Sequence, residues 1–375
     1  MTAVIRKQQL QRLFDAAVSA VSGRQAVAKA IREDSAFSPD LIVAVGKAAV
    51  GMTLGALDEW PDCAGLVVTK YDHVSDEFDA FEKVEVIESA HPVPDQHSLL
   101  AGARLIEAVE QLSPDSSVLF LVSGGASALV EALPAGVSLE VLMSVTNEML
   151  ATGKTIGEIN ARRKAFSLIK DGKLIERFPG KQMRVYAISD VEGDAISVIG
   201  SGLGDGYRLP ERASSWVIAS NEIARQAVVS AARKLELRVM ENSETLYGDI
   251  HDIANRLGPT LAEAPAGLYV FGGEPTVVLP QHPGRGGRNQ SLALAMSKYI
   301  AGRENISILV AGTDGTDGPT ADAGGLVDGT TWKAITASDA LARADAGTYL
   351  ERNRHLFTTG PTNTNVMDLL IALVE

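Results

Sequence analysis

Short apolar runs recur along the chain, and each is followed by a segment that favours a helix. These runs lie at residues 41–45, 65–68, 117–122, 185–188, 216–219, 267–271 and 306–311. Strands buried on both faces read as continuous apolar runs, and strands that alternate with helices form crossover units with largely parallel sheets. The pattern therefore predicts an α/β fold with largely parallel sheets.

The length of the chain favours more than one hydrophobic core. Its 375 residues exceed the ~150 that one domain usually holds. Residues 232–247 pass from a basic helical segment into a polar stretch, which is typical of a passage between modules. We therefore expect an N-terminal domain at residues 1–240 and a separate, smaller α/β domain at residues 241–375.

Composition excludes several classes of function. The formal net charge of −13 disfavours nucleic-acid backbones and anionic membranes, and an aromatic content of 5% argues against a surface that stacks single-stranded bases. The longest apolar tract, residues 41–57, contains Lys47 and is shorter than the ~20 residues of a membrane span. Cys63 is the only cysteine, which suits a reducing compartment. Because residues 1–21 read as an amphipathic helix rather than a signal peptide, we expect a cytoplasmic protein.

Two of the predicted strands end in groups suited to an anion. Lys47 follows residues 41–45 and one glycine at the start of a helical segment, where free N–H groups also attract an anion. Alternatively, its side chain extends from the strand end into solvent. Amides of the turn after residues 117–122 could surround a phosphate or carboxylate. This turn consists of Ser123, Gly124, Gly125, Ala126 and Ser127.

Two further segments allow either a structural or a functional interpretation. His91 lies in the sequence HPVPD, where two prolines fix an extended segment, and we interpret it as a structural turn residue rather than a general base. Residues 157–173 read as a helix on which Arg163 and Lys170 share one face, with Lys164 beside them. This basic segment is either a solvated face or the place where an anionic substrate binds.

Charged side chains also flank predicted strands and helices. Asp190 comes directly after residues 185–188, a position that suits a metal ligand, a base or a helix cap. Arg288 lies in a glycine-rich loop just before a strong helix, where its planar guanidinium group could bind an anion through two hydrogen bonds.

The segment from residue 308 to 330 is typical of the rim of an active site. A buried-strand pattern leads there into a glycine-rich loop that holds Asp314, Asp317 and Asp322. Clustered carboxylates repel one another unless a metal ion, substrate hydroxyls or helix N-termini compensate their charge. A second polar loop, residues 358–365, precedes what we interpret as the last helix, and it either binds substrate hydroxyls or caps that helix.

The motifs taken in chain order resemble one known family. They read VGKAAVGM, SAHPVPD, VSGGASALVEALP, GEINARRKAFSLIKDGKL, ISDVEGD, IASNEIA, FGGEPTV, GRGGRNQSLALA, AGTDGTDGPTADAGGLVDGTT and TGPTNTNVMDLLIAL. Over residues 12–374 the chain resembles the glycerate 2-kinases whose C-terminal module is called the MOFRL domain. The resemblance implies a Rossmann-like, doubly wound parallel sheet in the N-terminal domain, and an active site in the cleft between the two domains. It also implies transfer of the γ-phosphoryl group of MgATP to the 2-hydroxyl of D-glycerate.

Carried over by position, the resemblance implies catalytic roles for Lys47, Asp190 and Arg288. The two cations would neutralise charge on the transferred group, because phosphoryl transfer depends mostly on positioning and electrostatics. Asp190 would orient the glycerate hydroxyl or hold Mg²⁺, with Asp314 and Asp317 as further metal ligands. Contacts to the nucleotide or substrate are expected from Ser123, Gly124, Gly125, Ala126, Ser127, Arg163, Lys164, Asn221, Glu274, Asn289, Thr313 and Asn365.

Two positions depart from the family pattern. Residues 203–206 stand where the family commonly has a proline after a Ser-Gly pair, which predicts a looser loop. Ala165 replaces a histidine that usually follows the Arg-Lys pair, so no role of that imidazole transfers.

Two alternative functions fit the sequence less well. Family members have also been labelled hydroxypyruvate reductases, but the chain lacks a GxGxxG turn followed ~20 residues later by a ribose-binding acid. A non-catalytic sensor of sugar acids would have no use for Lys47, Asp190 and Arg288 together. We expect ATP, Mg²⁺ and D-glycerate as partners, no nucleic acid or membrane, and a chain that could form a homodimer.

Overall fold

The computed structural model describes residues 2–34, 36–152 and 156–375. Over these residues the chain divides into two compact units. We call residues 22–219 the central unit, and residues 1–21 with 220–375 the terminal unit. This division differs from the expected boundary at residue 240, and it assigns the first helix, α1 (Ala3–Ala20), to the terminal unit.

The strands described for the central unit form a parallel sheet in the order β3-β2-β1-β4-β5-β6. They are β1 (Leu41–Val45), β2 (Ala64–Lys70), β3 (Val84–Ser89), β4 (Ser117–Val122), β5 (Gln182–Ile188) and β6 (Ala213–Ala219). This is the order of a doubly wound, Rossmann-like sheet, in which the direction of winding reverses between β1 and β4. The predicted fold of the N-terminal domain is therefore confirmed.

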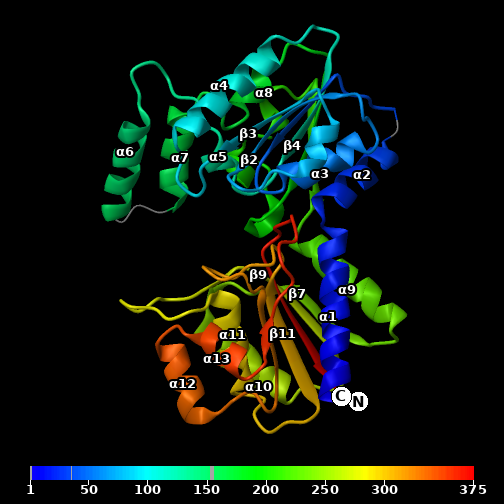
Figure 1. The fold of residues 1–375 in the computed structure, drawn as a ribbon, viewed down its shortest axis with the longest axis vertical. Coiled ribbons are helices and arrows are strands. Elements are labelled where there is room, and N and C mark those ends of the chain that lie inside the picture. The colour runs from blue at the N-terminus through cyan, green and yellow to red at the C-terminus, as the bar shows by residue number, and fades with distance from the viewer. Residues whose placement is uncertain (1, 35, 153–155) are drawn as a thin grey trace. The chain divides into compact units, whose positions relative to one another are not determined.

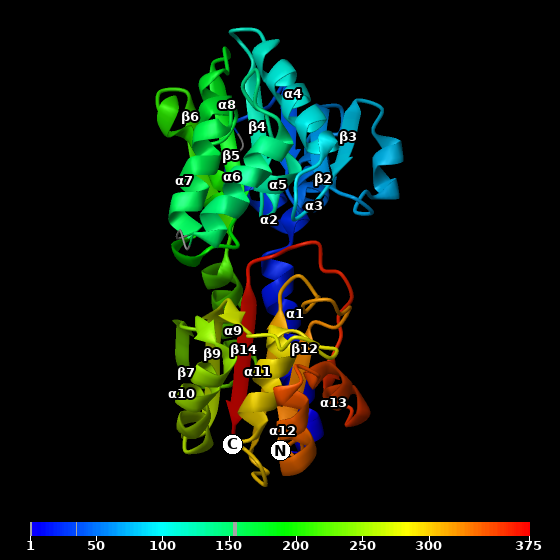
Figure 2. The same ribbon diagram turned by 90° about the vertical axis from the view of Figure 1, so that its left-hand side faces the viewer.

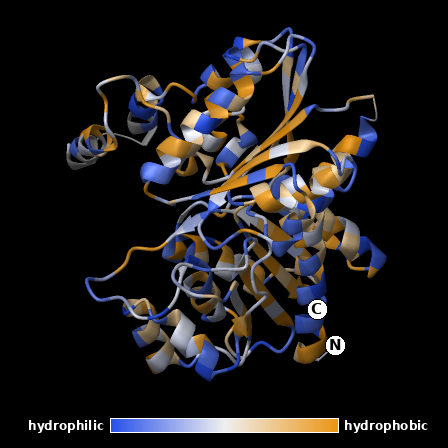
Figure 3. Ribbon diagram, turned by 45° about the horizontal axis from the view of Figure 1, so that its top comes forward, coloured by the Kyte–Doolittle hydropathy of each residue, from blue (hydrophilic) through white to orange (hydrophobic). Residues whose placement is uncertain are grey.

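Helices cover both faces of the central sheet. Helices α2 and α3 lie on one face, and α4, α5 and α8 lie on the other (Figure 1). The helices of this unit are α2 (Gly23–Glu33), α3 (Ala49–Leu57), α4 (Gln96–Glu110), α5 (Ala126–Leu129), α6 (Leu139–Ala151), α7 (Ile156–Phe166) and α8 (Lys173–Glu176). Strand β4 is buried at every position, as expected for a strand covered on both sides, and the strands stand out as hydrophobic in Figure 3. The HPVPD segment ends at Asp95, which caps α4 by accepting a hydrogen bond from the N–H of Ser98.

The sheet of the terminal unit is mixed rather than largely parallel. Its order is β13-β12-β11-β14-β9-β7, in which only the β7–β9 pair is parallel among the described residues. The strands of this unit are β7 (Val239–Glu244), β8 (Gly248–Asp249), β9 (Gly267–Gly273), β10 (Pro275–Thr276), β11 (Ile306–Gly312), β12 (Gly324–Asp328), β13 (Leu356–Phe357) and β14 (Asp368–Val374). The expectation of a last helix is wrong, because residues 368–374 form β14 inside the sheet (Figure 2). A short apolar run does not distinguish a buried strand from a buried helix, and here pairing with β11 and β9 decides.

Helices also cover both faces of the terminal sheet. Helices α1 and α9 lie on one face, and α10 and α11 lie on the other, with α12 and α13 beside α11. The remaining bounds are α9 (Asn221–Lys234), α10 (Ile250–Ala262), α11 (Arg288–Ser297), α12 (Ala334–Ala342) and α13 (Ala346–Arg352). None of the described helices combines the length and apolar character that spanning a bilayer requires.

Helix α1 belongs to the terminal unit because its buried face and two basic side chains both bind there. Leu10, Leu13 and Phe14 are fully buried, and the ring of Phe14 packs edge-on against Phe357 of β13 at 5.2 Å between centroids. Polar contacts add to this packing. Lys7 Nζ lies 2.7 Å from Asp328 of β12, and the neighbouring Arg6 contacts Glu375 and donates to Ser307 Oγ at 3.3 Å.

Candidate active site

The ends of β1 and β4 meet where the winding of the central sheet reverses. The N–H of Lys47 donates to the carbonyl of Gly124 at 2.9 Å, and the N–H of Ala48 donates to Ser123 Oγ at 3.1 Å. Ligands of doubly wound sheets bind at this reversal, outside the carboxyl ends of the strands. Lys47 and the turn at residues 123–127 therefore lie together, as expected.

The two glycines of this turn lie directly against the side chains of Lys47, His91 and Asp190. Gly125 has a φ of +85°, and a methyl group there would lie 3.0 Å from Lys47 Cγ and 3.1 Å from His91 Cδ2. A methyl group at Gly124 would overlap the carboxylate of Asp190, which follows β5. The absence of a side chain at Gly124 lets the backbone approach the carboxylate closely, and any larger residue would displace that carboxylate. We call Lys47, His91, Asp190 and residues 123–127 the switch-point group.

His91 is neutral in this setting, and Lys70 explains part of the reason. Burial, then the charges of Lys47 and Lys70, lower the pKa of His91 to about 4. Lys70 is the last residue of β2 and pairs in register with Ser89, two positions before His91. We did not predict Lys70 as a site residue from the sequence. Its position just after the end of a predicted strand, like that of Lys47, could have indicated it.

A loop behind the turn is packed rather than loose. Ser127 Oγ lies 2.8 Å from Ser201 Oγ, so the turn and the loop that contains residues 203–206 are joined. Leu203 is fully buried. The expectation of a looser loop at residues 203–206 is wrong, because Leu203 anchors it in the core without a proline. Lys164, expected at the substrate, donates to the carbonyl of Ser197 at 2.6 Å.

The predicted basic helix face is only partly present. Helix α7 ends at Phe166, so Lys170 does not share its face with Arg163. Instead, Lys170 Nζ lies 2.5 Å from Glu131 Oε2, and both side chains are completely buried. Arg163 lines a cavity together with residues 92–94. Ala165 is exposed on α7.

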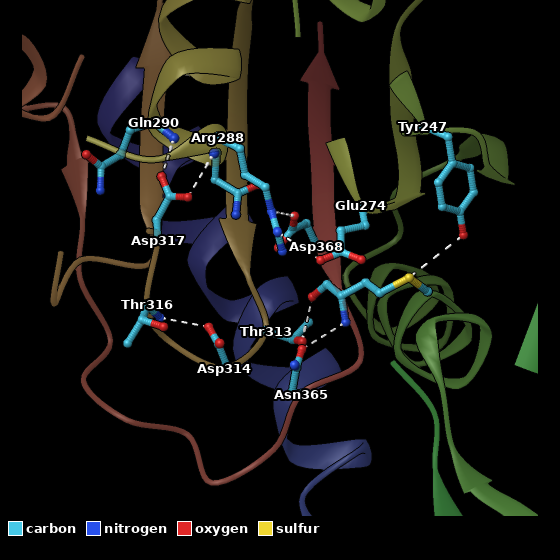
Figure 4. Close-up of polar contacts among 12 residues, drawn as sticks. Tyr247, Glu274, Arg288, Gln290, Thr313, Asp314, Thr316, Asp317, Asn365 and Asp368 are labelled. Atoms are coloured by element: carbon cyan, nitrogen blue, oxygen red, sulfur yellow. Dashed lines mark hydrogen bonds and ion pairs between the residues drawn. The ribbon is translucent and has the colours of Figure 1, made fainter. Parts of the chain in front are cut away.

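In the terminal unit, Arg288 begins α11 with its charge already compensated (Figure 4). Its Nε donates to Asp368 Oδ2 at 2.6 Å, and Nη1 donates to Glu274 Oε1 at 2.8 Å. Burial would lower the pKa of Arg288, but Asp368 and Glu274 raise it above its ordinary value. Arg288 is thus a fixed donor rather than an unpaired cation, which the sequence did not reveal because Asp368 lies 80 positions away.

Asp317 acts as a cap on α11. Its carboxylate accepts hydrogen bonds from the N–H groups of Asn289 at 3.0 Å and Gln290 at 2.7 Å. Burial raises the pKa of Asp317 to about 7, although these two N–H groups act in the opposite direction. Asp314 instead accepts from the N–H of Thr316 at 2.9 Å. We call Glu274, Arg288, Asn289, Asp317 and Asp368 the arginine group.

The expected metal ligands do not form a cluster of three within the described ranges. There, no three His, Cys, Asp or Glu side chains come together in a way that could hold an ion. Both oxygens of the buried Asp317 already accept a backbone hydrogen bond, and its role as a metal ligand stays a prediction from the sequence. Asp190 is half-buried beside the glycine turn and fits a magnesium ligand, since Mg²⁺ usually takes one or two carboxylates and completes its shell with substrate phosphates and water.

Three other expected contact residues hold the terminal unit together. The buried Asn221 donates to the carbonyls of Val366 and Asp368 and accepts from Arg225. Thr313 is also fully buried and donates to the carbonyl of Met367 at 2.6 Å. The Asn365 side chain accepts from the N–H of Met367. Asn289 differs, because its buried Oδ1 has no hydrogen-bond partner in the described part of the chain.

Comparison with known proteins gives consistent matches along the chain. A family model described as a domain of unknown function, DUF4147, matches residues 9–206, and the MOFRL family model matches residues 267–368. The chain is 35% identical to the D-glycerate 2-kinase of Thermotoga maritima, covering 89% of this chain and 90% of that protein. The crystal structure of a glycerate kinase from Thermotoga maritima is 30% identical, with a TM-score of 0.90 and coverage of 98% of this chain and 99% of that one. An Agrobacterium vitis protein with the provisional name hydroxypyruvate reductase is 32% identical over 99% of this chain and 95% of its own.

Proposed function

The chain belongs to the glycerate 2-kinase family, and we propose that it transfers the γ-phosphoryl group of ATP to the 2-hydroxyl of D-glycerate, giving 2-phosphoglycerate and ADP. The switch-point group carries this proposal. It combines a lysine, a glycine-containing turn and a carboxylate at the place where a doubly wound sheet binds its ligand.

We propose that Lys47 neutralises charge on the phosphoryl oxygens, while the turn at residues 123–127 fixes their position. Phosphoryl transfer needs little covalent chemistry from the protein, so a held cation and oriented amides supply most of the acceleration. The carboxylate of Asp190 orients the attacking hydroxyl and accepts its proton. Asp190 and the glycine turn are already in contact, which limits the reorganisation that the reaction requires.

In the terminal unit, we propose that the arginine group orients the substrate. Asp368 and Glu274 hold the guanidinium plane of Arg288 in one orientation, which favours a directed hydrogen bond over general attraction of anions. The buried Oδ1 of Asn289 is a candidate acceptor for a substrate hydroxyl. An active site in the cleft between the two domains stays a prediction from the sequence.

In the alternative role that we propose for Asp190, its carboxylate holds the Mg²⁺ that arrives with the phosphates of ATP instead of accepting the hydroxyl proton. When bound, the ion would add positive charge beside the transferred group. A cytoplasmic location and a homodimer remain predictions from the sequence, and light scattering of the purified protein tests the second.

The reductase name of one relative defines the competing function. The central sheet has the strand order of dinucleotide-binding folds, but its first turn lacks the GxGxxG pattern that those folds use for the pyrophosphate. The kinase therefore remains the function that the site supports best.

One assay distinguishes the two functions. The purified protein is supplied with D-glycerate, Mg²⁺ and ATP, and separately with hydroxypyruvate and NADH or NADPH. We expect 2-phosphoglycerate and ADP in the first reaction and no nicotinamide oxidation in the second. Lys47→Met should lower kcat by roughly 100-fold or more, as loss of a key electrostatic group does. Lys29→Met, at an exposed lysine of α2, should leave it unchanged.

A further inference from the structure

The central unit contains a small apolar cavity beside the switch-point group. Its volume is about 160 Å³, and its lining consists of Pro92, Val93, Pro94, Leu139, Leu142, Met143 and Arg163. Sites that hold a whole small molecule usually measure roughly 300–1,000 Å³. This cavity therefore suits one flat ring system, with the rest of the ligand outside it.

The cavity and the glycine turn are joined by one continuous segment. Pro92, Val93 and Pro94 form a wall of the cavity, and His91, the residue before them, lies against Gly125 of the turn. A ligand with an apolar ring at one end and an anionic chain at the other would follow this segment from the cavity to Lys47.

The wall also contains backbone groups that could pair with the edge of a base. Proline has no N–H, so Val93 supplies the only backbone donor of residues 92–94. Neither the N–H nor the carbonyl of Val93 has a hydrogen-bond partner in the described ranges. A donor and an acceptor on one residue match N1 and the 6-amino group of adenine. Arg163, also in the lining, can stack its guanidinium plane on a base.

The other end of this path is suited to phosphates. Lys47 comes just after β1, and Lys70 is the last residue of the neighbouring parallel strand β2. The two lysines therefore lie at the same edge of the sheet. Both influence the imidazole of His91, whose pKa they help to lower to about 4. A neutral imidazole can donate an N–H to a phosphate oxygen and adds no proton to the site at pH 7.

We propose that the central unit binds the whole of ATP, with the adenine ring in the cavity lined by residues 92–94, Leu142 and Met143, and the phosphates beside Lys47, Lys70 and His91. This inference rests on the proposed kinase function, and it assigns the nucleotide to the central unit and two further residues to the phosphate site.

Displacement of a fluorescent ATP analogue from the full-length protein, without D-glycerate, tests this assignment. ATP and adenosine should both displace the analogue. Met143→Asp replaces a partly exposed apolar side chain of the cavity lining by a charge, and it should weaken both by about 10-fold, the effect of losing one apolar contact with the ring. Val141→Asp introduces the same charge at a similarly exposed position of α6 that lies outside the lining, and it should change neither by more than about 2-fold.

The phosphate end is tested with the same assay. Lys70→Met should weaken ATP by about 10-fold and leave adenosine unchanged, since a lost charge–phosphate contact contributes about that much. His91→Leu should do the same, whereas His91→Gln, which keeps a neutral donor, should restore most of the affinity. If Lys70→Met raises only the KM for D-glycerate, the anion at Lys70 is the glycerate carboxylate and the assignment is wrong.

Three further results of the displacement assay would also overturn the inference. They are equal effects of Met143→Asp and Val141→Asp on ATP, no displacement by adenosine, and an equal loss of adenosine and ATP binding in Lys70→Met. Failure of the kinase function looks different, because ATP would then bind as described while D-glycerate is not phosphorylated. Conversely, phosphorylation of D-glycerate with unchanged ATP affinity in Met143→Asp would remove this inference alone.

Discussion

Replacement of Glu131 by glutamine should destabilise the central unit strongly. Glu131 follows the helix after the glycine turn, and its carboxylate binds the ammonium group of Lys170 at 2.5 Å with both side chains fully buried. Burial lowers the pKa of Lys170, and Glu131 opposes this effect. Glu131→Gln therefore leaves a buried cation without its counter-charge.

The magnitude follows from the two ways in which the protein can respond. Breaking a buried ion pair by removing one partner usually costs about 3–5 kcal/mol. Alternatively, Lys170 loses its proton, which at pH 7 costs at most about 5 kcal/mol for a group with an ordinary pKa of 10.5. By either route, the variant loses a large part of the free energy of unfolding, which is about 5–15 kcal/mol in total for a typical protein. Glu131→Met combined with Lys170→Met removes both charges and should cost far less than the single change.

Urea unfolding followed by tryptophan fluorescence measures this effect. In a Trp332→Phe background, the remaining tryptophans Trp60 and Trp216 both lie in the central unit and report on it alone. The stability deficit of Glu131→Gln should shrink as pH rises from 7 towards 10. A lysine whose folded pKa lies below its unfolded value binds fewer protons when folded, so stability rises with pH in that window.

Two results would refute this reasoning about the buried pair. One is a loss of less than about 1 kcal/mol in Glu131→Gln, the range of an exposed ion pair. The other is a double variant as unstable as the single one, which would show that shape rather than charge governs the site.

Three further predictions concern the glycine turn and two carboxylates. Gly124→Ala should reduce kcat by about 10-fold or more, because its methyl group would push the carboxylate of Asp190 out of its catalytic position. The coupled kinase assay measures this change. Asp317 has a folded pKa of about 7, above its ordinary value of 3.8. The free energy of unfolding should therefore fall as pH rises from about 4 to 7, by up to roughly 4 kcal/mol. Asp317→Asn should remove this dependence on pH. Burial would raise the pKa of Asp328, but Lys7 and Thr330 hold it at about 2; the resulting stability of roughly 2 kcal/mol is present above pH 4 and lost as pH falls towards 2. Calorimetry of Lys7→Met should show a smaller acid-dependent loss.

Simple outcomes would contradict these predictions. Gly65→Ala adds a methyl group in β2 near Val84 rather than near a catalytic side chain, so an equal loss of kcat in both glycine variants would point to a general folding defect. A flat stability curve between pH 4 and 7 in the unmodified protein would show that Asp317 titrates normally.

The central sheet could be predicted from the sequence because its signals are local. Residues 41–45 and 117–122 coincide with β1 and β4, since strands buried on both faces are apolar throughout and end where glycines begin. The position of Lys47 beside the turn followed from the same rule. Lys70 could have been found in that way as well, because it also ends a strand.

The remaining features depend on partners that are distant in sequence. Residues 368–374 form a strand only because β11 and β9 lie on either side of them. The sequence placed Lys170 on a helix that was either a solvated face or a site for an anionic substrate, but Glu131, 39 positions away, determines its place. Asp317 suggested a metal ligand, and only the position of the α11 backbone shows that it caps a helix. Local patterns cannot reveal such pairings.

Membership of α1 in the terminal unit has a consequence for how the chain folds during synthesis. The central unit is complete once Ala219 has emerged from the ribosome, whereas α1, which precedes it, must wait for partners made later. Its Arg6 contacts Glu375, the last residue of the sequence, and Lys7 needs Asp328. The central unit is in effect an insertion within a domain whose two ends arrive at opposite times. The apolar face of α1 therefore stays without its partners in the terminal unit while the whole central unit is made, and during that time it is open to non-specific association.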